Sequence, residues 1–421
     1  YYTVSNGKIF HNIEDHDDSW SEYPWRVNPD GYGSDWAEYN KWELWMNKES
    51  GNFINPKTMR GPFCESADVP DTAYDDGKGA VRTMEDLRRL KKMNKPFFLA
   101  CGFWRPHLPF NAPKKYWDMY ERDRIPLADN PYRPDNLPKE VTQSGELFSY
   151  ARVNDLQEEV FQREAKHGYY ACVSYIDAQI GMILEELKKL ELDKNTIVVL
   201  LGDHGWALGE HTFWGKHTLF DRATHVPLIV KVPGMETGKT ESMVSFVDLY
   251  PTLCDLCGLP QPEGQLQGKS FVPVLKDRKA KIQDEVFIQW QGGDNLVNNR
   301  YSYTEWVKKE KTSRMLFDHR DDKDENQNIA GQSRFQSLMD GFSAIIKNIN
   351  FRIANDCTSN GHTLLLTTGH ICSAFVNHFI KLVRLIHNKI IRLCHFCSFY
   401  QFFFVGIMLS KTHVVCNGSG K

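Results

Sequence analysis

The chain has 421 residues, 41% of them hydrophobic and 25% charged, so it is long enough to bury a large core and form two or three domains. Its formal net charge of -3 argues against a nucleic-acid-binding protein, since such proteins carry a basic surface. The first residue is Tyr1 rather than Met, and we expect the chain to start inside a longer protein.

The first predicted elements follow a long irregular stretch. Residues 1–95 are rich in Asp, Gly, Pro and Trp, and most of them are expected to form loops. A helix is predicted over 84–93, where Leu87 and Leu90 share one face. Residues 97–101 form a continuous apolar run directly after it, which is typical of a buried parallel strand.

The clearest pattern covers residues 165–201. Apolar residues recur at helical spacing up to Leu190, and a β-branched run at 196–201 then predicts a strand. A further strand is expected at 225–232 and a helix at 247–257, closed by Gly258. Helices alternating with buried strands indicate a layered α/β domain that covers residues 1–275.

The C-terminal part differs in its pattern. Residues 286–290, 301–306 and 314–318 alternate between apolar and polar, as in antiparallel strands, and a short helix is predicted over 335–346. We therefore expect a small α+β subdomain at 276–355.

The last segment, 356–421, has an unusual composition. No Asp or Glu occurs from Cys357 to Lys421, although the chain contains 54 acidic residues. Its apolar stretch at 398–409 is too short to span a bilayer, so no clear membrane span is predicted. We expect this basic, apolar tail to lie outside the fold.

Candidate site residues follow the strand at 196–201. Asp203 and His204 lie directly after it between two glycines, and His211 and Lys216 come soon after. In open α/β sheets ligands bind beyond the carboxyl ends of the strands, so a metal and an anion site are plausible there. The alternative is that Asp203 caps a helix and His204 is an ordinary loop histidine; the glycines and the lysine argue against it.

Two other places point to the same chemistry. His107 follows the predicted strand 97–101, and prolines on both sides restrict its backbone. Near the start of the chain, Lys8 and His11 lie three residues apart. That pair alone is a weak signal, because a solvated lysine beside a packed histidine is the default.

Together these segments resemble the iduronate-2-sulfatase family, over roughly residues 1–350. The resemblance rests on Gly202-Asp203-His204-Gly205-Trp206-Ala207-Leu208-Gly209-Glu210-His211, Trp214-Gly215-Lys216, Pro106-His107-Leu108-Pro109-Phe110, Gly7-Lys8-Ile9-Phe10-His11 and the ending Asp324-Glu325-Asn326. It implies an alkaline-phosphatase-like fold, with a layered sheet, helices on both faces and a small antiparallel C-terminal subdomain.

The resemblance also implies a function and roles. The expected reaction removes the 2-O-sulfate of a uronate in a sulfated glycan, in a lysosomal, secreted or periplasmic protein. Asp203 and His204 would bind one calcium ion. The residues that match the family's sulfate and sugar contacts would bind the substrate; they are Lys8, Lys216, Trp206 and His211. Two histidines would handle protons, namely His11 and His107.

Two elements that the resemblance implies are missing from the 421 residues: the early pair of aspartates that would help to bind calcium, and the nucleophile. The family's nucleophile is a formylglycine made from the first residue of a Cys-x-Pro-Ser-Arg or Ser-x-Pro-Ser-Arg sequence, and neither occurs here. We expect an N-terminally truncated, inactive sulfatase. A phosphate-ester hydrolase of the same superfamily and a non-catalytic module that binds sulfated glycans are the alternatives.

Overall fold

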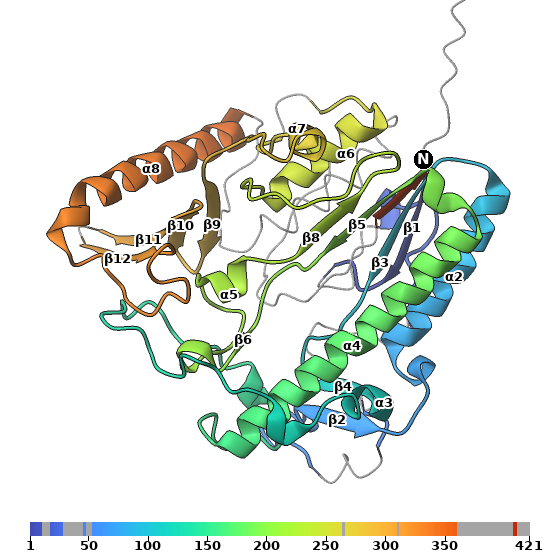
Figure 1. Cartoon of the computed structure of the whole chain (residues 1–421), viewed down its shortest axis with the longest axis horizontal. Helices are drawn as coiled ribbons and strands as arrows, with labels where there is room; N and C mark the ends of the chain where they lie inside the picture. The colour runs from blue at the N-terminus through green and yellow to red at the C-terminus, as the bar shows by residue number, and fades with distance from the viewer. Residues whose placement is uncertain are drawn as a thin grey trace, which may run out of the picture.

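The computed structural model describes residues 1–10, 17–27, 45–47, 53–262, 266–309, 311–359 and 407–410. Its main sheet has five strands in the order β1-β3-β13-β5-β8 (Figure 1). The strands are β1 (Tyr2–Gly7), β3 (Phe97–Gly102), β5 (Thr196–Leu201), β8 (Leu228–Lys231) and β13 (Ile407–Ser410).

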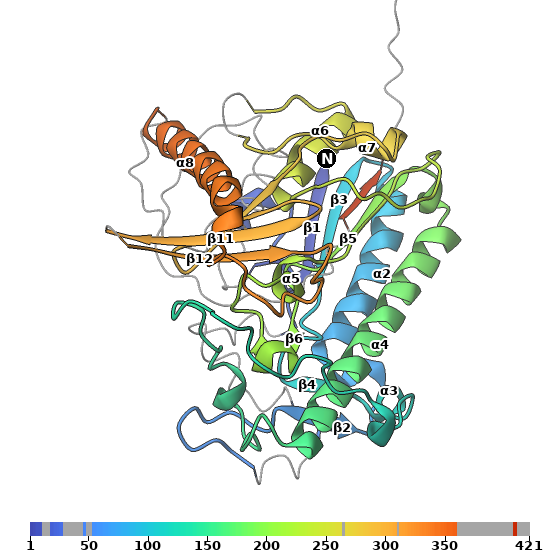
Figure 2. The same cartoon turned by 60° about the vertical axis from the view of Figure 1, so that its left-hand side comes forward.

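Helices cover both faces of this sheet, because its strands are apolar on both sides. On β3, Leu99 and Cys101 belong to the core that includes residues of α2 (Asp75–Met93) and α4 (Glu159–Lys189). Phe98 points to the opposite core, with residues of α6 (Leu249–Cys257) and α7 (Val272–Lys276). Figures 1 and 2 show α2 and α4 side by side along one face. The predicted α/β layering is thus confirmed.

A second sheet of four antiparallel strands follows in the chain. Its order is β12-β11-β10-β9, and α8 packs on it around Tyr303 and Phe342 (Figure 2). The elements are β9 (Val286–Trp290), β10 (Gly293–Val297), β11 (Tyr301–Lys308), β12 (Lys311–Asp318) and α8 (Gln336–Ser359). The antiparallel C-terminal sheet is as predicted, although β10 was not expected from the pattern.

Shorter elements connect these units. They are β2 (Cys64–Ala67), β4 (Phe110–Pro113), α3 (Lys114–Trp117), β6 (Ala207–Leu208), β7 (Trp214–Gly215) and α5 (Asp221–Thr224). Within the described part of the chain, no helix has the length and apolar character that a membrane crossing requires.

Several elements differ from the sequence-based expectation. β1 lies in the stretch expected to be mostly loop, because its six residues are too few to show a period. β8 pairs antiparallel with β5, whereas β1 pairs parallel with β3. Helix α2 begins at Asp75, nine residues before the predicted start. Polar residues on its exposed side make the apolar spacing hard to recognise in the sequence.

The tail also departs from expectation at four residues. β13 lies between β3 and β5 and is antiparallel to both. For Ile407–Ser410, therefore, the expectation that 356–421 lies outside the fold does not hold.

Candidate functional site

The carboxyl ends of β1, β3 and β5 meet at one edge of the main sheet. β1 and β3 are parallel, with Gly7 opposite Gly102, and β3 and β5 run in the same direction because both are antiparallel to β13. Lys8, the loop after Gly102 and Asp203 therefore leave the sheet at the same edge. This is where ligands bind in open α/β sheets.

β1 and β3 approach each other very closely at their carboxyl ends. Lys8 N–H donates to the carbonyl of Gly102 at 3.1 Å. A Cβ on Gly102 would lie only 1.7 Å from the Lys8 carbonyl oxygen, so no other residue fits there without a shift of the backbone. Glycine at this position is what places the lysine beside the loop that carries His107.

A buried carboxylate from α2 holds that loop. Asp76 accepts the backbone N–H of Trp104 at 2.7 Å and that of Arg105 at 3.1 Å. Burial raises the pKa of Asp76 to about 6, and the Arg105 charge opposes the rise. The next residues of the loop lead to His107, which is fully buried.

His107 belongs to a compact polar cluster with Lys216 and Glu146. Lys216 Nζ lies 2.5 Å from His107 Nε2, and 3.1 and 3.4 Å from the two carboxylate oxygens of Glu146. Glu146 Oε1 is also 3.0 Å from His107 Nε2. His107 Nδ1 is 2.9 Å from the carbonyl of Leu108, which can only accept. Nδ1 therefore carries the proton in the neutral ring, and Nε2 accepts from the Lys216 ammonium.

Burial and charge together shift the titration of all three groups. Burial, followed by the Lys216 charge, lowers the pKa of His107 to about 4, so the ring is neutral at pH 7. Burial also lowers the pKa of Lys216, against the charge of Glu146. For Glu146, burial acts to raise the pKa, but the positive charge of Lys216 holds it well below its usual range.

His217 extends this cluster toward the second sheet. Its Nδ1 lies 2.7 Å from the Ser144 hydroxyl, which also accepts the backbone N–H of Glu146 at 3.2 Å. Its ring stacks on Trp290 of β9, with centroids 5.2 Å apart and an angle of 20° between the planes. Burial and the neighbouring Lys216 charge lower the pKa of His217 to about 4.

Trp206 forms a wall beside the cluster. Its ring meets the His107 ring edge-on at 5.5 Å, and Lys216 Nζ lies 5.4 Å from its centroid. The ring of His204 lies 6.3 Å from the same indole. The structure thus brings together three residues of the resemblance motif, namely His204, Trp206 and Lys216, with His107 from another segment.

Asp203 and His204 present two donors to a metal. His204 Nδ1 lies 2.8 Å from the Gly205 carbonyl, so in the neutral ring Nδ1 carries the proton, and Nε2, 3.8 Å from Asp203 Oδ1, has the lone pair. Calcium takes six to eight ligands, nearly all oxygens. Among the residues the structure describes, no third His, Cys, Asp or Glu joins the pair. These two side chains alone do not fit calcium.

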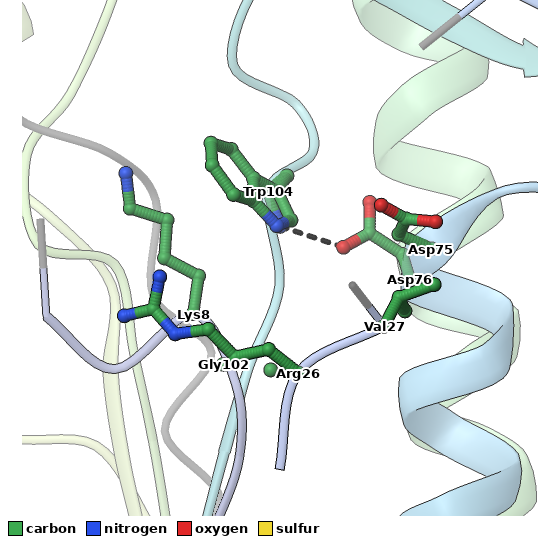
Figure 3. A pocket seen from close by; sticks show the side chains of 8 residues that line it. Lys8, Arg26, Val27, Asp75, Asp76, Gly102 and Trp104 are labelled. Atoms are coloured by element: carbon green, nitrogen blue, oxygen red, sulfur yellow. Dashed lines mark hydrogen bonds between the residues drawn. The ribbon is translucent and has the colours of Figure 1, made fainter. Parts of the chain in front are cut away.

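Lys8 lines a small pocket at the same edge of the sheet (Figure 3). Its ammonium lies 4.3 Å from the centre of the Trp104 ring, and Arg26 extends beside it. The pocket is small and open to solvent, and Asp75 and Asp76 form its other side. The pocket thus brings two cationic side chains and two carboxylates together.

His211, which was predicted to contact the substrate, lies in a packed environment instead. His211 is buried against Phe220, with ring centroids 4.6 Å apart, and its backbone N–H donates to Asn130 at 2.8 Å. These contacts are those of a packed histidine. His11 lies outside the residues that the structure describes.

Sequence reasoning did not find Glu146, Ser144 or His217. Glu146 and Ser144 lie in a long irregular loop without periodic pattern, so nothing in the sequence marks them. His217 directly follows Lys216, and that adjacency was the one available signal.

Comparison with known families and proteins gives a consistent result. The sulfatase family model matches residues 32–259, and the model of the C-terminal part of N-sulphoglucosamine sulphohydrolase matches 209–351. The iduronate 2-sulfatase of Mus musculus is 34% identical over 310 residues, which are 62% of this chain and 53% of that protein. The chain therefore spans about half the length of that relative.

The likeness to a second relative and to a solved structure extends over a larger share of this chain. A sulfatase of Formosa agariphila is 31% identical over 362 residues, 83% of this chain and 68% of the relative. The phosphonate monoester hydrolase of Silicibacter pomeroyi superimposes with a TM-score of 0.61 at 21% identity, over 75% of this chain and 68% of that one. At this identity the likeness concerns the fold, which is the alkaline-phosphatase-like fold that the sequence predicted.

Proposed function

Because the chain belongs to the sulfatase family, we propose that its site binds the sulfate ester of a uronate in a sulfated glycan, as the likeness to iduronate 2-sulfatases suggests. The observation that carries the proposal is the buried cluster of Lys216, His107 and Glu146 at the edge of the sheet from which Lys8 also emerges. Such a cluster holds a cation and an imidazole in fixed positions for an anionic group.

Each residue has a role that its contacts support. Lys8 and Lys216 neutralise the sulfate oxygens, because Lys8 follows the carboxyl end of β1 and the Lys216 ammonium contacts His107, whose loop follows β3. His107 handles the proton at the leaving oxygen through Nε2, since its Nδ1 is engaged with a carbonyl. Trp206 forms the apolar side of the site.

Other roles rest on the family resemblance. His11 would be the second proton-handling histidine. Asp203 and His204 would be two of the ligands of a calcium ion, which requires further oxygen ligands besides this pair. A hard cation at that point would neutralise charge on the sulfate. The compartment implied by the resemblance is the lysosome, the periplasm or the outside of the cell.

We further propose that these 421 residues bind the ester without cleaving it. None of the ten cysteines begins a Cys-x-Pro-Ser-Arg sequence, and no serine begins the corresponding serine form. A site that neutralises charge and handles protons but lacks a nucleophile gives binding without turnover.

Calorimetry on the 421-residue chain tests the proposal directly. A disaccharide with a 2-O-sulfated uronate should bind, its desulfated form should bind at least tenfold more weakly, and no free sulfate should accumulate. Equal affinity for the two disaccharides would refute a sulfate site, and release of sulfate would refute the absence of turnover. Tighter binding of a matching phosphate monoester would instead favour a phosphate-ester hydrolase.

A further inference from the structure

The Ser144 hydroxyl joins His217 to the backbone of Glu146. Its oxygen accepts the Glu146 N–H at 3.2 Å and lies 2.7 Å from His217 Nδ1. A neutral imidazole with its proton on Nε2 has a lone pair on Nδ1, so the hydroxyl donates to the ring while it accepts from the amide. Hydrogen bonds in such a chain strengthen one another. His217 therefore acts on Glu146 through one shared oxygen.

The ring of His217 is fixed independently of this hydrogen bond. It stacks on Trp290 of β9, with centroids 5.2 Å apart and 20° between the planes. Its backbone lies in a tight turn, because the N–H of Thr218 donates to the carbonyl of Lys216 at 2.8 Å. The second sheet and this turn together set the direction in which Nδ1 points.

Ser144 packs directly on the backbone that precedes Lys216. Gly215 has a φ of 129°, and a Cβ built on it would lie 3.3 Å from the Ser144 Cβ and 3.5 Å from its hydroxyl oxygen. Glycine suits both the backbone conformation and the close approach of the serine. The loop of Ser144 and the segment of Lys216 and His217 are thus in contact at this point.

The other side of Glu146 is held by Ser149. The Ser149 hydroxyl donates to the Glu146 carbonyl at 2.5 Å, and the Ser149 N–H donates to the same oxygen at 3.0 Å. Arg60 Nη1 in turn donates to the Ser149 hydroxyl at 2.5 Å. Since this anchor does not involve His217, the loss of His217 should shift Glu146 and not release it.

The charge of Lys216 depends on where Glu146 lies. A carboxylate oxygen of Glu146 is 3.1 Å from Lys216 Nζ. Burial lowers the pKa of Lys216; the charges of Glu146 and Asp203 oppose this, and that of Arg60 adds to it. His107 Nε2, the other group at 2.5 Å from Nζ, belongs to a neutral ring. A shift of Glu146 away from Nζ would therefore make the lysine easier to deprotonate.

The contacts of His217 also have a simpler explanation. A serine that accepts the N–H two residues further on is a common turn, and an imidazole stacked on an indole is ordinary packing. Packing alone does not require that a ring nitrogen meet the hydroxyl of that serine. The short contact with Ser144, next to the residue that compensates Lys216, favours a role in the site.

We propose that His217 is a positioning residue, which acts through the Ser144 hydroxyl to hold Glu146 against Lys216 and so keeps the site lysine charged for a sulfate. The part that concerns sulfate rests on the proposed function. The connection from His217 to Lys216 does not, and it is measured without a ligand.

Two substitutions of His217 separate the hydrogen bond from the ring. His217→Phe keeps a ring for Trp290 but has no acceptor, whereas His217→Asn keeps a polar side-chain atom near the position of Nδ1 but has no ring. His217→Phe should lower the pKa of Lys216 by about 1, because an opposite charge moves away from it. His217→Asn should leave this pKa close to that of the unaltered chain.

NMR titration of the Lys216 ¹³Cε signal in chain labelled on lysine measures this pKa, and Lys216→Arg identifies the signal. The control is His225→Asn, since His225 is exposed and follows α5; it should have no effect. An unchanged Lys216 pKa in His217→Phe overturns the positioning role. So does a pKa that falls as far in His217→Asn as in His217→Phe, because ring packing would then be responsible.

Ser144 provides an independent check of the same connection. Ser144→Ala should lower the Lys216 pKa at least as far as His217→Phe does, because it removes the acceptor of the Glu146 N–H. The double variant S144A/H217F should lower it no further, since His217 acts only through that hydroxyl. Additive effects of the two substitutions would mean that His217 acts on Lys216 by another route.

Calorimetry with the 2-O-sulfated disaccharide separates this role from the proposed function. The pH above which affinity declines should be lower in His217→Phe by the same amount as the Lys216 pKa, because only the charged lysine attracts sulfate. If the Lys216 pKa responds as expected but the unaltered chain does not bind the disaccharide, the proposed function is refuted and the positioning role stands. If the disaccharide binds and His217→Phe leaves the Lys216 pKa unchanged, the positioning role is refuted and the proposed function stands.

Discussion

Lys216 Nζ lies 2.5 Å from His107 Nε2, although 109 residues separate the two in sequence. Both side chains are fully buried, and the carboxylate of Glu146 contacts each of them at 3.0 to 3.1 Å. The lysine charge is therefore compensated by one buried carboxylate, and the imidazole remains neutral. The cluster is stable only as a set, because any member left alone would be a buried group without its partner.

Replacement of Lys216 by Met should lower the free energy of unfolding by about 3 kcal/mol or more, because it leaves the Glu146 carboxylate buried without its cation. Urea denaturation at pH 7 measures the change. The double variant K216M/E146Q should be more stable than K216M, since it removes the uncompensated charge. If the loss of stability in K216M/E146Q equals the sum of the losses in K216M and in E146Q, the ion pair does not couple these residues.

The neutral state of His107 predicts a pH dependence of stability. The folded chain takes up this proton only near pH 4, whereas the unfolded chain takes it up near its ordinary pKa of 6.5. The unfolded state is therefore favoured increasingly as pH falls from 6.5 to 4, and the contribution of His107 is complete above 6.5. Denaturation midpoints at pH 7 and pH 5 should fall further apart in the unaltered chain than in His107→Gln.

The comparison with His107→Gln matters because other groups titrate in the same range. His217 acts in the same direction, since its pKa is also about 4. Asp76 acts in the opposite direction, because its pKa is raised to about 6 and the folded state binds its proton first. His217 and Asp76 are present both in the unaltered chain and in His107→Gln, so their effects cancel when the two proteins are compared. An equal pH dependence in both would mean that His107 does not titrate as its burial requires.

The sequence predicted the parts of the fold and site that depend on local pattern. β3 and β5 were found because a continuous apolar run is what a strand buried on both faces requires. Asp203 was placed correctly at a strand end for the same reason. Glu146 could not be found, because its position beside Lys216 depends on the path of an irregular loop. The stack of His217 on Trp290 depends likewise on how the two sheets pack.

Asp76 should control the exchange of two particular amides. Its carboxylate accepts the N–H groups of Trp104 and Arg105, and hydrogen bonds to a charged group contribute about 1.5–3 kcal/mol each. In Asp76→Ala, hydrogen exchange at these two amides should accelerate at least tenfold. Asp75→Ala, in the same helical turn, should leave them unchanged because Asp75 is paired with Lys78. Equal effects of the two substitutions would show only a general loosening of α2.

The close approach of β1 and β3 predicts opposite results for two glycines. In Gly102→Ala the new Cβ would lie 1.7 Å from the Lys8 carbonyl oxygen, so the β1 end must move away from the loop that carries Trp104. Since this neighbour is backbone and cannot rotate aside, we expect a loss of about 3 kcal/mol or more, as for a severe overpacking. Gly181 lies within α4 with nothing near its Cβ position, and Gly181→Ala should stabilise the chain by about 0.5–1 kcal/mol.

Urea denaturation of both glycine variants and calorimetry with the sulfated disaccharide check these two expectations. Gly102→Ala should also lose ligand affinity, because Lys8 is displaced, whereas Gly181→Ala should keep it. A stable Gly102→Ala variant with unchanged affinity would mean that Lys8 does not need this contact to face the ligand.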